Sequence, residues 1–367
     1  MRLAALLVAA AGGLAGLAAR ALAAPLVALD DQFYHDADEL TVAAGDAHAC
    51  ALERVAGTEV GGEVVCWGDA GGAGTGAGAG AGLGGASPLE APAGLFVQLS
   101  AAARHTCGVT LEERAVCWGA TAPRALLAGD AAAAAARAGA PPVVQVSTGA
   151  AHTCTVDQAG RIDCFANGGS RGRAGGGASG GNVRGQLDAP RDAAFVQVSV
   201  GNEQSCALRR DGTLACWGSP RGGLLRPPEG QFLQASVSPA GGSACAVALK
   251  GHLECWGALY GPHGGQGRVN GTFLQVTVGP LVTCAVRAAG TLQCFGDERR
   301  LWRSAGAPEP TTPFVEVSAA SAAGDAALCG VTAERVARVL CFGDVPPISS
   351  APLDLEPAVQ ELLNFDL

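Results

Sequence analysis

The feature that most constrains this chain is one pattern that it writes seven times. One copy reads FVQVSVGNEQSCALRRDGTLACWG, from Phe195 to Gly218, with two cysteines ten positions apart and an Asp-Gly turn between them. The copies begin at Leu40, Phe96, Val143, Phe195, Phe232, Phe273 and Phe314. Repeats of roughly forty to fifty residues are typical of stacked supersecondary units, which cannot bury their apolar faces alone.

Each copy has the pattern of a small β-sheet. Alternating β-branched and aromatic residues flank a turn such as Asp211-Gly212, which predicts a hairpin. An F-x-Q strand precedes the hairpin, and a variable segment that can hold a fourth strand follows it. Seven small sheets bury their faces best by radial packing. The sequence therefore predicts an all-β fold, a seven-bladed β-propeller over residues 39–344.

All fourteen cysteines belong to the repeat, two in each copy. In a hairpin centred near Asp211, positions 206 and 216 lie opposite each other, close enough for a disulfide. The predicted pairs are Cys50 with Cys66, Cys107 with Cys117, Cys154 with Cys164, Cys206 with Cys216, Cys245 with Cys255, Cys284 with Cys294, and Cys329 with Cys341. We expect the extra residues of the first and seventh copies to lengthen only the turns, Glu53 to Glu63 and Thr332 to Arg338.

Zinc binding is the alternative role for so many cysteines. The chain has no C-x-x-C pair and only six histidines, so we expect no metal and no cofactor. An even number of cysteines at regular spacing is typical of oxidised proteins outside the cytoplasm. Each bridge closes a loop of about ten residues. In the chain-entropy description this lowers the entropy of the unfolded chain and so raises the free energy of unfolding by roughly 2.5 to 3 kcal/mol.

An aromatic residue follows the second cysteine of every copy. These residues are Trp67, Trp118, Phe165, Trp217, Trp256, Phe295 and Phe342. Successive side chains of a strand point to opposite faces, so each ring points away from the adjacent sulfur. We expect the rings to form an aromatic core between blades; a ring of exposed aromatics that grips sugar is the alternative.

The two ends of the chain lie outside the repeats. Residues 1–23 have the layout of a secretory signal peptide, with Arg2, an apolar and glycine-rich stretch, and small residues near the expected cleavage site. A signal-anchor helix and a transit peptide are the alternatives. Residues 24–38 form a lead-in, and residues 345–367 form a tail that supplies either a closing strand or a short helix. We expect no stable membrane insertion after signal cleavage.

Charge and motifs exclude several classes of function. The formal net charge is −9 and the basic residues are scattered, so nucleic acid is not expected as a partner. No nucleophile elbow, phosphate-cradling loop or carboxylate pair is present, so we expect no catalysis. His48, His105 and His152 recur just before the first cysteine of their copies, which favours a structural hydrogen bond over a ligand role.

The variable segments are the places where specificity can differ. They are long after the first three copies, at Asp69 to Leu95, Ala120 to Pro142 and Ala166 to Ala194. This asymmetry suggests a binding edge over the first three blades; mobile low-complexity filler is the alternative interpretation. Asn270 begins an Asn-Gly-Thr sequon for N-glycosylation in a predicted loop.

The pattern resembles the regulator of chromosome condensation repeat, a family of seven-bladed propellers. The resemblance rests on H-T-C-x-V or S-C-A-L, a D-G or A-G turn, C-W-G, and a later G-Q-L at Gly185-Gln186-Leu187. That family includes a nuclear exchange factor for the Ran GTPase, secreted inhibitors of β-lactamase, and ectodomains of crinkly-type plant receptor kinases. The paired cysteines are most similar to the last group, although no kinase motif or membrane span follows here. The nuclear exchanger needs a basic face, which a chain with a net charge of −9 does not supply.

Together these features predict a monomeric binding module that is secreted or lies on the outer face of the cell. Its expected ligand is a protein or a glycan. A secreted enzyme inhibitor is one alternative. An exchange factor is the other, if the cysteines are reduced and the protein is intracellular.

The redox state and the leader can be checked by one mass measurement. Protein purified from its own source without reductant should start near Ala24 and weigh fourteen hydrogens less than the reduced chain, because two hydrogens are lost from each of seven cysteine pairs. Intact-mass spectrometry before and after reduction measures both. A full-length, fully reduced mass would contradict export and favour the intracellular alternative.

Overall fold

A computed structural model describes residues 42–55, 60–68, 89–130, 139–168, 182–257, 267–304, 307–309, 311–321, 326–333, 338–344 and 353–354. The expected signal peptide (1–23), the lead-in (24–38) and all of the tail (345–367) except residues 353–354 lie outside these ranges. Large parts of the three long variable segments also lie outside them.

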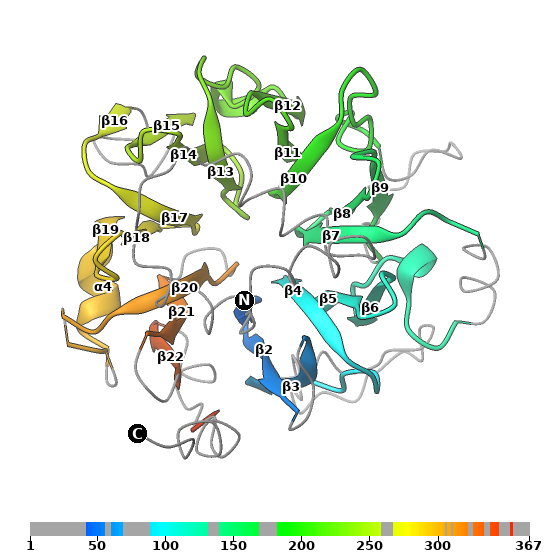
Figure 1. The fold of residues 1–367 in the computed structure, drawn as a ribbon, viewed down its shortest axis with the longest axis horizontal. Helices are drawn as coiled ribbons and strands as arrows, with labels where there is room; N and C mark the ends of the chain where they lie inside the picture. Colours follow the sequence, from blue (N-terminus) through cyan, green and yellow to red (C-terminus); the bar gives the residue numbers. More distant parts are fainter. Residues whose placement is uncertain are drawn as a thin grey trace, which may run out of the picture.

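Six antiparallel sheets among the described residues surround a central axis (Figure 1), and one of them, with six strands, forms two blades. Blade 1 holds β1 (Val42–Ala44), β2 (His48–Arg54) and β3 (Gly62–Gly68); blade 2 holds β4 (Phe96–Ala102), β5 (His105–Thr110) and β6 (Ala115–Gly119); blade 3 holds β7 (Val143–Thr148), β8 (His152–Asp157) and β9 (Ile162–Ala166). Blade 4 holds β10 (Phe195–Val200), β11 (Gln204–Arg209) and β12 (Leu214–Gly218); blade 5 holds β13 (Phe232–Val237), β14 (Ser243–Ala248), β15 (Leu253–Gly257) and β16 (Gly267–Val269). Blade 6 holds β17 (Phe273–Val278), β18 (Val282–Arg287) and β19 (Leu292–Gly296); blade 7 holds β20 (Phe314–Ala319), β21 (Ala327–Thr332), β22 (Arg338–Gly343) and β23 (Leu353–Asp354).

This arrangement is the predicted seven-bladed propeller. The described helices are short: η1 (Arg124–Leu126), η2 (Arg221–Gly223) and α4 (Glu298–Trp302). A single pairing, Gly62 with Phe96, joins the sheets of blades 1 and 2. The F-x-Q strand of each copy from the second onward is the innermost strand of its blade, as Figure 1 shows for β4, β7, β10, β13, β17 and β20.

Each blade carries the predicted disulfide across its second and third strands. Cys206 pairs directly with Cys216 in the register of β11 and β12, and the other six pairs are equivalent. The Cα atoms of the paired cysteines are 4.0–4.1 Å apart. So short a separation is that of opposed residues that exchange no backbone hydrogen bonds, where side chains approach most closely. The disulfides therefore occupy the sites that suit them best.

One expectation about the insertions is wrong. In the first copy the extra residues do not lengthen the turn alone, because Glu53 pairs with Glu63 and Arg54 pairs with Gly62 in a ladder that continues beyond the disulfide. In the seventh copy the ladder ends at Val331 and Val339. Adding equal numbers of residues to both strands keeps the cysteines opposed, so an insertion can extend a hairpin as readily as its turn.

The core lies between blades rather than within one sheet. Every junction buries the disulfide of one blade with the aromatic residue of the next, so that Trp118 packs with Cys50 and Trp217 packs with Cys154. The same rule holds for Phe165, Trp256, Phe295 and Phe342. Trp67 of blade 1 packs with Cys329 and Cys341 of blade 7, so the same contact closes the ring. Trp118, Trp217, Trp256 and Phe342 are buried, and Trp67, Phe165 and Phe295 are partly buried.

The inner strands are joined by a repeated polar contact. Gln98 donates through Nε2 to the carbonyl of Val146 and accepts its N–H through Oε1, both at 2.9 Å. Two residues later, the hydroxyl of Ser100 accepts the N–H of Thr148 at 3.0 Å. Gln145, Gln197, Gln234 and Gln275 make equivalent glutamine contacts with the following blade. The Q-x-S part of the motif is therefore a connector between blades.

The described part of the tail completes the last blade. β23 pairs with the outer strand β22, with Val339 opposite Leu353 and Arg338 opposite Asp354. Of the two roles expected for the tail, these residues take the strand, as a fourth strand on blade 7. The helix expected at residues 357–363 lies outside the described ranges.

Removing one ring should test the inter-blade core. Trp217→Ala should lower the free energy of unfolding by about 3 to 5 kcal/mol, because it leaves a cavity beside Cys154 and removes an indole hydrogen bond. Leu111→Ala, at a side chain that is 44% exposed, is the control and should change the urea midpoint little. Equal midpoints for both variants would contradict the inter-blade role of Trp217.

Candidate binding surface

The two faces of the propeller carry different parts of the repeat. The hairpin rim is defined here as the face with the turns between the second and third strands, such as Asp211-Gly212. The histidine rim is the opposite face, where His48, His105 and His152 begin their strands and each third strand ends. The variable segments start at the histidine rim and return to the hairpin rim.

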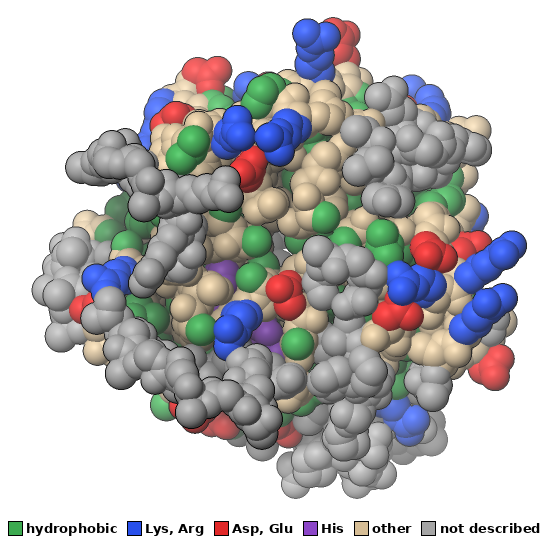
Figure 2. Space-filling view, turned by 180° about the vertical axis from the view of Figure 1, so that it is seen from behind, with side chains coloured by type: hydrophobic (Ala, Val, Ile, Leu, Met, Phe, Trp, Pro, Cys, Tyr) green, Lys and Arg blue, Asp and Glu red, His purple; other side chains and the backbone are tan. Residues whose placement is uncertain are grey.

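Charged side chains do not form a patch of one sign on the face in Figure 2. Lys and Arg alternate with Asp and Glu among its described residues. Ion pairs in the described structure include Arg184 with Glu203 at 3.8 Å and Arg300 with Asp344 at 2.9 Å. Within the described ranges, no group of three or more His, Cys, Asp or Glu side chains is placed to hold a metal ion. No helix there is both long and apolar enough to cross a membrane.

The glycine of C-W-G lets the histidine rim close tightly. Gly218 has φ of 103°, and a Cβ at this position would lie 2.3 Å from the carbonyl oxygen of Glu203. A side chain is excluded there both by the backbone conformation and by the close approach of the turn. The rim is therefore a rigid base from which the variable segments leave.

Tryptophan side chains fix parts of those segments. The indole N–H of Trp217 donates to the carbonyl of Gln186 at 3.0 Å, and that of Trp256 donates to the carbonyl of Leu224 at 2.9 Å. Gln186 and Leu224 are themselves buried. The G-Q-L of the sequence is thus an anchor that places the incoming segment on the next blade. Val183, beside this anchor, is 75% exposed.

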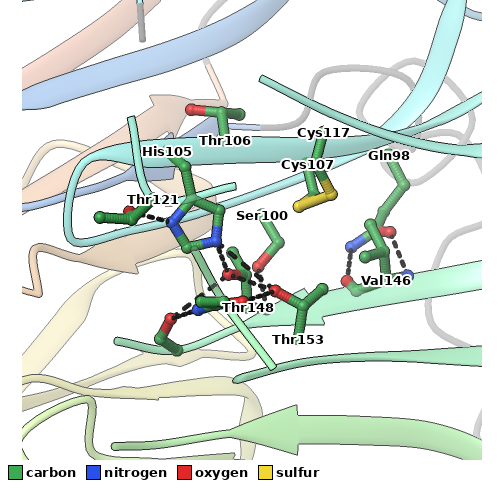
Figure 3. The surroundings of a disulfide bond; sticks show 12 residues. Gln98, Ser100, His105, Thr106, Cys107, Cys117, Thr121, Val146, Thr148 and Thr153 are labelled. Atoms are coloured by element: carbon green, nitrogen blue, oxygen red, sulfur yellow. Dashed lines mark hydrogen bonds between the residues drawn. A yellow bond between two sulfur atoms is a disulfide. The ribbon is translucent and has the colours of Figure 1, made fainter. Parts of the chain in front are cut away.

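The three recurring histidines join neighbouring blades. His48 Nε2 is hydrogen-bonded to Thr106 Oγ1 of blade 2 at 2.9 Å, and His152 Nε2 to Ser205 Oγ of blade 4 at 2.7 Å. His105 lies between Thr121 Oγ1, at 2.7 Å, and Thr148 of blade 3 (Figure 3). The expectation of a structural hydrogen bond is confirmed, because each ring is hydrogen-bonded to a buried hydroxyl of the next blade, on Thr106, Thr148 or Ser205.

Burial keeps these three rings neutral. It lowers the pKa of His48 and His152 from 6.5 to about 4. It lowers the pKa of His105 to about 3, with a smaller contribution from His48. A neutral imidazole can both donate and accept, which suits a link between two hydroxyl groups. Their hydroxyl partners Thr106, Thr148 and Ser205 are buried as well, so each pair links two blades inside the core.

Asn270 is exposed at the end of β16, near the hairpin rim. Its side-chain oxygen accepts a hydrogen bond from Arg268 Nε at 3.2 Å. The sequon threonine, Thr272, is also exposed. The described structure therefore leaves this asparagine accessible, and its glycosylation stays a prediction.

A groove that the sequence did not predict lies beside blade 6. The β19 groove has a volume of about 510 Å³ and is lined by Leu292, Gln293, Cys294, Phe295, Glu298 and Trp302. Its floor is four consecutive residues of β19, and its other wall comes from α4. The Trp302 ring stacks on Phe342 with ring centroids 5.5 Å apart, which fixes this wall. No repeated motif marks Glu298 or Trp302, because both lie in a variable segment.

Comparison with known proteins agrees with this geometry. Residues 195–223, the opening of blade 4 with its hairpin, match the Regulator of chromosome condensation (RCC1) repeat. The match covers the three strands of blade 4 and η2. The other six copies share the strands, disulfide and aromatic position of blade 4. No curated protein matches the sequence.

Three solved structures show the same fold at low sequence identity. The entire ectodomain of the Physcomitrella patens receptor kinase CR4 is 18% identical with a TM-score of 0.58, covering 83% of this chain and 72% of that chain. The CRINKLY WD40 ectodomain of the Arabidopsis thaliana receptor kinase ACR4 is 18% identical with a TM-score of 0.58, and the match covers 86% of this chain and 98% of that chain. Prp20p from Saccharomyces cerevisiae, described with its binding to Gsp1p and histones, is 15% identical with a TM-score of 0.50, covering 88% and 85%.

Acid should weaken the propeller through its buried histidines. Their pKa values are lowered on folding, so the unfolded chain binds more protons between about pH 6.5 and pH 3 to 4. The contribution of the neutral histidines to the free energy of unfolding is therefore fully present above pH 6.5, and it is lost as the pH drops through this window. For His152 the difference amounts to about 3 kcal/mol.

His152→Gln isolates one contribution, because Gln204 occupies the same position in blade 4. The variant should lose stability at pH 8 through imperfect packing, and its deficit should shrink by pH 4. Urea unfolding at pH 8, 6, 5 and 4 measures both. A deficit that stays constant with pH would contradict neutral burial of His152.

Proposed function

We propose that the protein works outside the cytoplasm as a binding module without catalytic activity. The observation that carries this proposal is the disulfide in every blade, at the centre of every inter-blade core. Bridges of this kind persist where the surroundings are oxidising. In a reducing cytosol the fourteen thiols would lose the constraint that offsets small, alanine-rich blades.

The structural neighbours support a role in recognition. Two of them are ectodomains of plant receptor kinases, although their likeness to this chain extends to the fold only. The rigid interior and the variable periphery suit recognition, because binding residues are commonly placed on loops held by a rigid scaffold. The ligand class that we propose is a protein or a glycan exposed at a cell surface.

The disulfides also separate this proposal from the exchange-factor alternative. That alternative needs an intracellular protein with reduced cysteines. Prp20p shares the fold, but its binding to Gsp1p and histones belongs to that protein. The proposal would give way to this alternative if the native protein proved reduced.

Binding to intact cells tests the proposed function. Full-chain protein, oxidised and labelled at an added terminal tag, should bind saturably to the outside of cells from the source organism. The same chain with Cys206→Ser and Cys216→Ser is the control for blade 4, and heat-unfolded protein is the control for nonspecific adhesion. Flow cytometry with unlabelled protein as competitor measures the effect. Equal, non-saturable signal from native and unfolded protein would contradict the proposal.

A further inference from the structure

The outer edge of blade 6 differs from those of its two neighbours. Blade 5 covers its third strand with β16, and blade 7 covers its third strand with β23. The sheet of blade 6 ends at β19, and no described strand lies on its outer side. The β19 groove occupies this position.

The backbone of β19 points hydrogen-bonding groups into the groove. The Cα atoms of Cys284 and Cys294 are 4.0 Å apart, the spacing of a pair without mutual backbone hydrogen bonds. The N–H and C=O of Cys294 therefore point away from β18. Blade 2 supports this direction, because the carbonyl of Cys117, at the same repeat position, accepts the N–H of Ala128 at 2.8 Å on the outer side. By the two-residue period of a strand, Leu292 and Gly296 also point outward.

The fourth strands of the neighbouring blades show what such an edge accepts. In blade 5, Val269 lies opposite Leu253, which occupies the position of Leu292. In blade 7, Leu353 lies opposite Val339 at that same position. Both added strands are antiparallel, and both place an apolar residue there. Directly opposed side chains share a face, so an equivalent residue on β19 would contact Leu292 and lie on the side of Trp302.

Charge gives a second requirement. Glu298 is the charged residue among those that line the groove, and it is exposed. It follows the end of β19, so an antiparallel strand would bring its first residues toward this carboxylate. In the added strand, a residue opposite Phe295 comes three positions before the residue opposite Leu292. A basic residue at the first of these positions would therefore lie near Glu298, and the apolar residue at the second would lie near Leu292.

We propose that the β19 groove binds an extended peptide segment of a partner protein, which adds to β19 as an antiparallel fourth strand. The segment carries a basic residue next to Glu298 and, three positions later, an apolar residue between Leu292 and Trp302. Backbone hydrogen bonds supply the affinity, and the two side chains supply the specificity. This inference rests on the proposed binding function and names its partner as a protein.

Hydrogen exchange tests whether the edge is open. In the free, full-chain protein the amides of Cys294 and Gly296 should exchange quickly, while those of Gln293 and Phe295, which point to β18, should be protected. NMR at two protein concentrations measures this. Protection of Cys294 at both concentrations means that the protein's own chain covers the edge, and protection that grows with concentration means that a second copy does. Either result overturns the proposal.

A synthetic peptide tests the strand itself. The probe is acetyl-Ser-Lys-Gly-Arg-Val-Asn-amide, in which Gly-Arg-Val copies Gly267–Val269 and Lys faces Glu298. Its Gly and Val N–H groups should face β19. N-methylation of Val should therefore weaken binding at least about tenfold, while N-methylation of Arg, whose N–H faces away, should change it less than about twofold. Equal effects of the two methyl groups would overturn strand addition.

A charge exchange tests the side-chain contact. Glu298→Lys should lower the affinity for the probe by about two- to fivefold. A second probe with Glu in place of Lys should bind this variant more tightly than it binds the unchanged protein. Glu229→Lys, in the connection before blade 5, is the matched control and should change neither affinity. Failure of the exchanged pair to recover affinity would overturn the assignment of Glu298.

The two proposals fail in distinguishable ways. If the probe does not bind while native protein still binds saturably to cells, the groove inference falls and the binding function stands. If the probe binds with the expected N-methyl pattern while cells are not bound, the groove is supported and the cell-surface ligand is wrong.

Discussion

The contact between each disulfide and the aromatic ring of the next blade holds this propeller together. The blades are narrow, because their strands are rich in alanine, valine and glycine, and a single sheet of this kind has little apolar volume. A disulfide and a ring together fill the space at every junction, from Cys50 with Trp118 to Cys329 with Trp67. The disulfide and the ring therefore act together, and losing either one would weaken the junction that they fill.

Polar groups complete the junctions near the axis. Glutamine and serine side chains bind the backbone of the next inner strand, so the edge groups of that strand do not remain unpaired. The closing junction uses a shorter version, in which Ser318 accepts the N–H of Ala44 and Ser321 contacts Asp46. Three histidines add hydroxyl contacts across the first three junctions. The glutamine, serine and histidine groups in these links are neutral, so they tolerate burial without the cost of buried charge, and the one carboxylate, Asp46, is only partly buried.

A rigid interior of this kind leaves the periphery free to vary. The outer edge of a blade can be covered by a fourth strand, as in blades 5 and 7, or left as a groove, as in blade 6. The connecting segment after blade 6 also contributes to the inter-blade core, because Leu301 and Trp302 of α4 pack with Phe342 at the junction of blades 6 and 7. Recognition through an added strand would use the outward backbone groups of the third strand, which blades 5 and 7 pair with their own fourth strands.

The sequence by itself determined the fold and the disulfides. The cysteine spacing and the Asp-Gly turns place each pair on opposed strands, and the alternation of a strand sends the following ring to the other face. Neither conclusion depends on contacts between distant residues. The sequence also contained the F-x-Q-x-S pattern, but the function of its glutamine depends on a bulge after Phe96 and on the strand of the next blade, Val146.

Only the tertiary structure decided what the variable segments do. Gln186 and Leu224 became anchors because tryptophans of the following blades reach their carbonyls, and no local pattern records that approach. Glu298 and Trp302 came together with β19 because α4 folds back beside the edge strand. Local chemistry thus specifies each hairpin, whereas a groove arises from the packing of segments whose composition alone does not fix their path.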